Sequence, residues 1–232
     1  EVLAAVAAMT AEQAAAAAAA IVVRYDELES VTDLEAALAP DSPLVHEDWQ
    51  SYAVSGDTVR DRNVCSFSSI SKGDIEAGLA EADHVITSRY EADASHAAPI
   101  EPRAILAEWQ GDKVTIWTST QVPFDARAGV CETLGMPTNK VRIIVPHLGG
   151  GFGGKCGFHF EAHIAALARA GKRPVKLVFT RREEFLAPDR RREAMIVELT
   201  TGVRSNGTIS ARKGRLLLDN GAYAADAAFF PQ

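Results

Sequence analysis

The sequence lacks any run of apolar residues long enough to cross a bilayer, for which roughly 20 consecutive apolar residues are needed. It also lacks a surplus of basic residues, because 24 Lys and Arg stand against 31 Asp and Glu, giving a net charge of −7. A nucleic-acid groove needs the opposite balance of charge. These two shortages argue against a membrane protein and against a nucleic-acid-binding protein.

Cysteine is scarce as well, with only Cys65, Cys131 and Cys156 in 232 residues and no C-x-x-C pair among them. Zinc and iron–sulfur cages need clustered cysteines, so we expect no such metal site within this chain. A sparse, odd set of thiols is typical of a reducing compartment and predicts a cytoplasmic protein. The hydrophobic fraction of 47% is sufficient for a packed core.

The N-terminal part contains seven consecutive alanines, Ala14 to Ala20. Alanine favours helix, so we predict a helix over residues 10–20 with Thr10 as its N-cap. A signal peptide would need a basic start, whereas the chain opens with Glu1. We expect a strand on each side of the helix, the second over residues 21–25. Because the chain has no initial Met, we expect it to be part of a longer protein.

Residues 40–70 show no sustained hydrophobic period and predict an extended linker. Beyond them, helical and strand patterns alternate. The predicted elements include a hairpin around Gln110-Gly111-Asp112, helices over 124–134 and 159–170, and two long strands joined through Asn206-Gly207. Since strands both alternate with helices and pair as hairpins, the fold class is predicted to be α+β.

The segment from Gly149 to Lys155 has five glycines in seven positions, between a predicted strand and a predicted helix. Without Cβ atoms, backbone N–H groups can approach a ligand closely, and the helix start favours an anion. A plain tight turn rarely needs so many glycines. The segment satisfies the P-loop pattern G-x-x-x-x-G-K, but Cys156 stands where a P-loop has Ser or Thr to hold magnesium, and a thiol suits that ion poorly.

A second interpretation of this segment is a dinucleotide-binding fingerprint. Gly149, Gly151 and Gly154 satisfy G-x-G-x-x-G. The next predicted strand, 175–180, is followed by Arg181 and Arg182, which suits the 2′-phosphate of NADP better than NAD. The pattern is weak alone, and no further strand–helix–strand units follow. An NADP-binding oxidoreductase domain is therefore kept as an alternative.

A third interpretation comes from the order of six short motifs. The chain resembles the molybdopterin-binding large subunit of the xanthine dehydrogenase/aldehyde oxidase family. The motifs are Leu44-Val45-His46-Glu47-Asp48, Lys72-Gly73-Asp74, His96-Ala97-Ala98-Pro99-Ile100-Glu101-Pro102, Thr118-Ser119-Thr120-Gln121, the glycine segment, and Asp219-Asn220-Gly221-Ala222-Tyr223. The resemblance implies the end of an α/β hammerhead domain over 1–39, a linker over 40–70, and the N-terminal part of the molybdopterin-binding domain over 71–232.

The resemblance implies an enzyme that hydroxylates an aldehyde or a nitrogen heterocycle, as a small-molecule substrate, with oxygen taken from water. Its cofactor is molybdopterin, as such or as the cytosine dinucleotide. The implied partners are the rest of the large subunit, an iron–sulfur subunit carrying 2Fe-2S clusters and an FAD subunit. The family's catalytic glutamate lies beyond this segment, so we expect these 232 residues to be inactive alone. A non-catalytic scaffold or remnant of the family is the remaining alternative.

The resemblance also assigns roles to individual residues. Gln121 matches a glutamine that hydrogen-bonds an oxygen ligand of molybdenum, and Phe152 is placed near the metal as a wall of the substrate pocket. Both are thus catalytic candidates and cofactor contacts, although a polar strand end and a core aromatic are the simpler interpretations. The remaining cofactor-binding candidates are Gly149, Gly150, Gly151, Gly153 and Gly154. No metal ligand is predicted.

Four neighbouring features receive weaker predictions. Lys155 is a polar-network or phosphate partner, or a solvated lysine. Cys156 stands where purine-oxidising members carry a glutamate, which argues against purine substrates. His96 and Glu101 are predicted to be scaffold rather than an acid–base pair. The mixed charges over 181–193 predict a hydrated surface.

Overall fold

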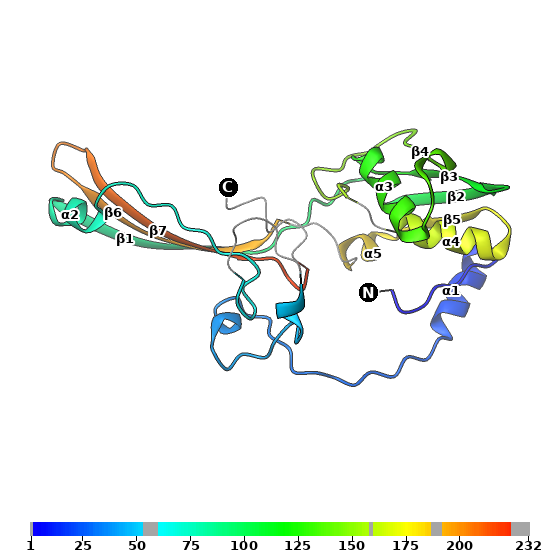
Figure 1. Ribbon diagram of the computed structural model, residues 1–232, viewed down its shortest axis with the longest axis horizontal. Helices are drawn as coiled ribbons and strands as arrows, with labels where there is room; N and C mark the ends of the chain where they lie inside the picture. The colour runs from blue at the N-terminus through cyan, green and yellow to red at the C-terminus, as the bar shows by residue number, and fades with distance from the viewer. Residues whose placement is uncertain (1, 53–59, 158–159, 187–191, 224–232) are drawn as a thin grey trace. The chain divides into compact units, whose positions relative to one another are not determined.

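The computed structural model describes residues 2–52, 60–157, 160–186 and 192–223. The chain divides into two compact units, each visible in Figure 1. The first unit comprises Glu1–Tyr25 and His96–Arg192, and the second comprises Asp26–Ser95 and Glu193–Gln232. Within the described residues, no helix has the length and apolar character of a membrane span. Both helices and strands are present, as the sequence predicts.

A four-stranded sheet organises the first unit (Figure 1). The strand order is β4 (Val141–Ile144), β3 (Lys113–Thr118), β2 (Ala104–Gln110), β5 (Val175–Val178). Strands β2 and β3 form the predicted antiparallel hairpin, and Gly111 at its turn has a φ of +62° that favours glycine. Strand β5 pairs antiparallel with β2, whereas β4 pairs parallel with β3.

Two helices, α3 (Pro123–Leu134) and α4 (Glu161–Gly171), pack against this sheet and against each other. The alternation of side chains along β2 and β3 sends every second residue into the core they cover. The fully buried members include Ala107, Ile116 and Val130. The helix predicted over 159–170 is thus present as α4, although residues 158–159 lie outside the described part.

The second unit is built on an antiparallel sheet of β1 (His84–Ala92), β6 (Ala194–Val203) and β7 (Ile209–Asp219). The predicted hairpin through Asn206-Gly207 joins β6 to β7, with Gly207 at a φ of +84°. The short helix α2 (Ile75–Ala80) packs on this sheet, chiefly on β7. Its N-cap Asp74 accepts a 3.0 Å hydrogen bond from the N–H of Ala77.

After residue 25, the other regular elements of the described part are three 3-10 turns, η1 (Ala36–Leu38), η2 (Trp49–Ser51) and η3 (Thr138–Lys140), and the short helix α5 (Arg181–Leu186). Between residues 40 and 70, the described part holds only η2 and an isolated bridge between Asp61 and Val64.

The N-terminal predictions are half right. Helix α1 (Ala11–Ala19) is present, and the Thr10 hydroxyl accepts a 3.2 Å hydrogen bond from Gln13 N as its cap. The strands predicted on either side are wrong, because residues 2–9 and 21–25 form no strand. Val22 is 86% exposed, and none of the strands in the described part of the chain pairs with residues 21–25. β-branched residues favour a strand only where a partner exists.

Two helical glycines yield opposite expectations for replacement by alanine. Gly78 in α2 lies where an added Cβ would be 2.8 Å from both Ala211 Cβ and the Ser210 carbonyl oxygen. At Gly171, the last residue of α4, nothing lies within 4 Å. Gly78→Ala should lower the free energy of unfolding by about 1–3 kcal/mol, since overpacking outweighs the helix propensity of alanine. Gly171→Ala should raise it by about 0.5 kcal/mol.

Urea denaturation of both variants and the parent checks this pair. A Gly78→Ala variant at least as stable as the parent would contradict the close packing of α2 on β7.

Candidate functional site

Gln121 holds the glycine segment through the carbonyl oxygen of its side chain. It follows the end of β3, after the buried residues Ser119 and Thr120. Its Oε1 accepts hydrogen bonds from Gly153 N at 3.0 Å and from Lys155 N at 3.2 Å. Its own backbone N–H donates to the Lys155 carbonyl at 2.9 Å. The segment is therefore tied to the end of β3 at three points.

These contacts fix the orientation of the Gln121 amide. Both partners of the side chain are backbone N–H donors, so the atom facing them must be the acceptor oxygen. The NH₂ group consequently points to another side. Among the described residues, Gln121 Nε2 has no hydrogen-bond partner. It is also not a buried polar atom left unsatisfied in the protein interior. The site thus offers one oriented, uncommitted donor pair.

The glycines of the segment are required for different physical reasons. A Cβ at Gly151 would lie 2.4 Å from Gln121 Oε1, and a Cβ at Gly149 would lie 2.6 Å from Glu101 Cβ. Gly150 and Gly153 have φ values of +95° and +88°, which side chains rarely adopt. The close approach that the sequence predicts is therefore made partly by the protein's own side chains.

Phe152 lies in the middle of the segment with a φ of +53°. A left-handed conformation costs a non-glycine residue about 1–2 kcal/mol. Its ring is 76% exposed and packs over Gly150 on one side. The interpretation of Phe152 as a plain core aromatic is wrong, because the residue is largely exposed.

Glu101 links the two ends of the glycine segment. Its Oε2 accepts from Gly149 N at 2.8 Å and from Lys155 Nζ at 2.7 Å. Lys155 is 0% exposed, so the interpretation as a solvated lysine is wrong and the polar-network interpretation is right. Burial raises the pKa of the Glu101 carboxyl, but the hydrogen bonds from Lys155 and Gly149 more than offset this, and the pKa lies below its usual range. Glu101 is engaged as scaffold, as predicted.

His96, the other residue of that predicted scaffold pair, accepts the Ala98 N–H at Nδ1 over 2.9 Å. In the neutral ring the proton is therefore on Nε2. Its ring centroid lies 4.9 Å from that of Phe185. The Nδ1 of His96 is engaged with Ala98 N, and the Glu101 carboxylate is engaged with Gly149 N, so the two side chains do not act as an acid–base pair.

A second ion pair, between Arg103 and Glu184, lies beside the segment and is buried on both sides, at 3% and 0% exposure. Arg103 donates Nη1 to Glu184 and Nη2 to the Gly154 carbonyl, and its backbone N–H donates to Glu184 Oε2 at 2.8 Å. Burial lowers the pKa of Arg103 and Glu184 opposes this, and an arginine stays charged in either case.

Sequence reasoning missed this ion pair. The mixed charges over 181–193 predicted a hydrated surface, which is wrong for Glu184 in α5, whereas residues 187–191 lie outside the described part. A signal was available: Thr180 and Glu183 form a capping box, with Thr180 N donating to Glu183 Oε2 at 2.7 Å and Glu183 N donating to Thr180 Oγ1 at 3.2 Å. The T-x-x-E pattern predicts that a helix begins at this point. A helix there would turn Glu184 toward one face.

The NADP interpretation does not fit this arrangement. In a dinucleotide-binding unit, the strands before and after the glycine turn and its helix belong to a parallel strand–helix–strand unit. Here β4 and β5 lie at opposite edges of the sheet, with β3 and β2 between them. Arg181, the candidate for the 2′-phosphate, instead donates to the carbonyls of Pro99 and Ile100 at 2.7 and 2.5 Å.

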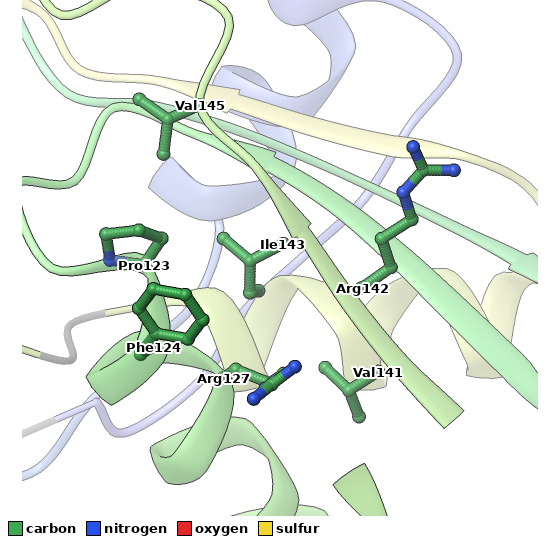
Figure 2. A pocket seen from close by; sticks show the side chains of 7 residues that line it. All are labelled: Pro123, Phe124, Arg127, Val141, Arg142, Ile143 and Val145. Carbon is green, nitrogen blue, oxygen red and sulfur yellow. The ribbon is translucent and has the colours of Figure 1, made fainter. Parts of the chain in front are cut away.

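A separate pocket of about 380 Å³ lies between the start of α3 and the edge strand β4 (Figure 2). The lining residues are Pro123, Phe124, Arg127, Val141, Arg142, Ile143 and Val145. None of them belongs to the glycine segment, and Gln121 does not line the pocket.

Within the described residues, no three His, Cys, Asp or Glu side chains gather as they would around a metal ion.

The Glu101–Lys155 pair predicts a pH-dependent stability. A lowered carboxyl pKa contributes stability that is present above the unfolded value of about 4.3 and is lost as the pH falls through the folded value. Glu101→Gln should lower the free energy of unfolding by about 1–3 kcal/mol at pH 7, because the buried Lys155 loses its counter-ion. The difference from the parent should narrow below about pH 4.

Urea titrations at pH 7 and at pH 3.5 measure this effect. The control is Asp112→Asn, which removes the exposed ion pair with Lys140. We expect that change to alter stability little, because solvent screens the pair. A Glu101→Gln effect equal at both pH values would contradict the assignment.

The model of the molybdopterin cofactor-binding domain family matches residues 57–232. The chain is 34% identical over 226 residues to the nicotinate dehydrogenase large molybdopterin subunit of Eubacterium barkeri, covering 97% of this chain and 50% of that protein. It is 40% identical over 141 residues to the aldehyde oxidoreductase molybdenum-binding subunit of Escherichia coli (strain K12), covering 60% of this chain and 19% of that subunit.

Solved structures agree on the fold. Quinoline 2-oxidoreductase from Pseudomonas putida 86 matches with a TM-score of 0.79 at 26% identity, over 93% of this chain and 26% of that one. Aldehyde oxidoreductase from Desulfovibrio gigas matches with a TM-score of 0.77 at 21% identity, over 90% and 22% of the two chains, which shows the fold alone. The chain spans half the length, or less, of these relatives. Because the family model covers most of the sequence, the chain belongs to the molybdopterin-binding proteins of the xanthine dehydrogenase/aldehyde oxidase family.

Proposed function

We propose that this chain holds a molybdenum cofactor against the Gln121 amide, in an enzyme that hydroxylates an aldehyde or a nitrogen heterocycle with oxygen taken from water. The observation that carries the proposal is the state of that amide. Its oxygen accepts hydrogen bonds from Gly153 N and Lys155 N, and its NH₂ group has no hydrogen-bond partner among the described residues. A donor of this kind suits an oxygen ligand of a metal centre, because an amide N–H can hydrogen-bond the ligand without competing for the metal.

The residues around the amide fit such a group. Gly150 and Gly153 hold the segment in a left-handed path, and Phe152 extends from it with a strained backbone. Backbone strain concentrates at functional sites, where the surrounding structure maintains it. The exposed ring of Phe152 would exclude water beside the cofactor and form one wall of a substrate pocket. Gly149, Gly151 and Gly154 complete the backbone surface proposed to lie against the cofactor.

When bound, the cofactor supplies the oxidation–reduction chemistry and the oxygen transfer. The chain's own part is to donate a hydrogen bond from Gln121 Nε2, to present the segment backbone, and to limit water at Phe152. The resemblance places the proton-accepting glutamate outside these 232 residues. The isolated chain is therefore expected to be inactive, and turnover by it would overturn this part of the proposal.

The finer assignments belong to the same proposal. We place the end of a hammerhead domain at residues 1–39, the linker at 40–70, and the start of the cofactor domain at 71–232. The partners would be the remainder of the large subunit, a 2Fe-2S subunit and an FAD subunit, in the cytoplasm, with the pterin as such or as its cytosine dinucleotide. The three free thiols support the location.

The substrate class follows from Cys156. It is partly buried and lies directly after Lys155, where the resemblance places a purine-contacting glutamate. A thiol cannot replace a carboxylate as a charged acceptor at neutral pH unless its pKa is strongly lowered. We therefore propose an aldehyde or a heterocycle other than a purine as the substrate.

The cofactor content tests the proposal directly. In the assembly purified from its native host with its partners retained, molybdenum and pterin should be near-stoichiometric with this chain. The measurements are elemental analysis of molybdenum and fluorescence of the oxidised pterin. A well-folded, intact assembly without either would overturn the proposal in favour of a non-catalytic scaffold.

Substitutions at Gln121 separate its two tasks. Gln121→Glu keeps an oxygen for Gly153 N and Lys155 N but removes the NH₂ donor, so it should retain molybdenum and lose at least about tenfold in kcat, because removal of one preorganised donor is costly. Gln121→Ala removes both and should also release the segment, lowering the molybdenum content. Full turnover in Gln121→Glu would show that the donor has no catalytic role.

A further inference from the structure

The peptide unit between Gly154 and Lys155 lies between two side chains that are far apart in the sequence. Its carbonyl oxygen, on Gly154, accepts from Arg103 Nη2. Its N–H, on Lys155, donates to Gln121 Oε1 at 3.2 Å. Because a trans peptide is planar, with its C=O and N–H pointing in opposite directions, fixing one group fixes the other. Arg103 on one side therefore determines where the N–H points on the other.

We propose that Arg103 is a positioning residue, which acts on the Gln121 amide through the peptide unit between Gly154 and Lys155. This inference rests on the proposed role of Gln121. The contacts of Arg103 that carry this inference are those with Glu184 and with the Gly154 carbonyl. Its guanidinium orients the Gly154 carbonyl, the adjoining N–H then holds Gln121 Oε1, and the NH₂ group is aimed as a consequence.

The chain of hydrogen bonds from Arg103 through this peptide to Gln121, called the relay below, is also polarised. A guanidinium at the Gly154 carbonyl polarises the peptide and strengthens the N–H on its other end as a donor, because hydrogen bonds in a chain reinforce one another. The Gln121 carbonyl oxygen accepts that stronger bond, so its NH₂ becomes a stronger donor in turn. Burial of Arg103 at 3% exposure keeps this effect from being screened by water.

The shape of arginine is required for this arrangement. Arg103 uses Nη1 for Glu184 and Nη2 for Gly154, two partners on different branches of the same planar fork. A lysine has one nitrogen at a different reach and cannot reproduce both contacts in the same geometry. Glu184 balances the buried charge and also accepts the Arg103 backbone N–H at 2.8 Å, which keeps the guanidinium in register with the start of β2.

Hydrogen exchange in the assembled protein tests the relay. We compare the parent, Arg103→Lys, Arg103→Met and Val130→Ala, where Val130 is a buried core residue of α3 that has no part in the segment. Both Arg103 variants lose the charge-assisted hydrogen bond to the Gly154 carbonyl, so the adjoining peptide is held less firmly. The amides of Gly153 and Lys155 should therefore exchange at least about tenfold faster in both variants. Pterin and molybdenum content should fall in parallel.

Val130→Ala controls for general loss of stability. It should lower the melting temperature without accelerating exchange at Gly153 and Lys155. The inference is overturned if these amides exchange no faster in Arg103→Lys than in Val130→Ala. Failure of the proposed function is a different observation, namely that the parent assembly contains neither molybdenum nor pterin, and exchange in the segment would still report on the relay.

Discussion

The hydrogen bonds from Gly153 N and Lys155 N to Gln121 Oε1 are the constraint on which the site depends. For two backbone donors to converge on one side-chain oxygen, the segment must curl back toward the end of β3. That curl takes left-handed residues at Gly150, Phe152 and Gly153. Strand β3 determines where Gln121 lies, and the packing of α3 and α4 on the sheet determines where β3 lies.

Buried charge provides the second requirement. Lys155 and Arg103 are both removed from water, and each ion costs several kcal/mol to bury before its partner compensates. Such pairs add little net stability compared with apolar residues of the same volume. What Glu101 and Glu184 contribute is a single conformation. Each cation has a partner reached from a different part of the chain, so alternative paths of the segment would leave a buried charge unpaired.

The sequence was informative where local chemistry decides the structure. Asn206-Gly207 and Gly111 correctly predicted the two hairpins, and Thr10 correctly predicted a helix N-cap, because turn and cap geometry depend on a few adjacent residues. The failures have a common cause. Residues 21–25 have strand propensity but pair with no strand among the described residues. Glu184 is buried against Arg103, which lies 81 positions away in the sequence. Neither fact is written in the neighbouring sequence.

The candidate site divides in the same way. The glycine segment and Gln121 were singled out from the sequence, but the contact between them was not predictable from spacing. The match to G-x-G-x-x-G has a different origin from a dinucleotide turn. Gly149 and Gly151 are needed because Glu101 and Gln121 occupy the space of a Cβ, so the same glycine spacing arises from internal packing.

It follows that a glycine-rich pattern identifies a close approach but not what approaches. In this chain the approaching groups are side chains delivered by the start of β2 and the end of β3. Phe152, in the same segment, stays largely exposed. A ligand assignment from the glycines alone would have placed an anion where Gln121 and Glu101 already lie. The informative unit is the segment together with its partners at 101, 103 and 121.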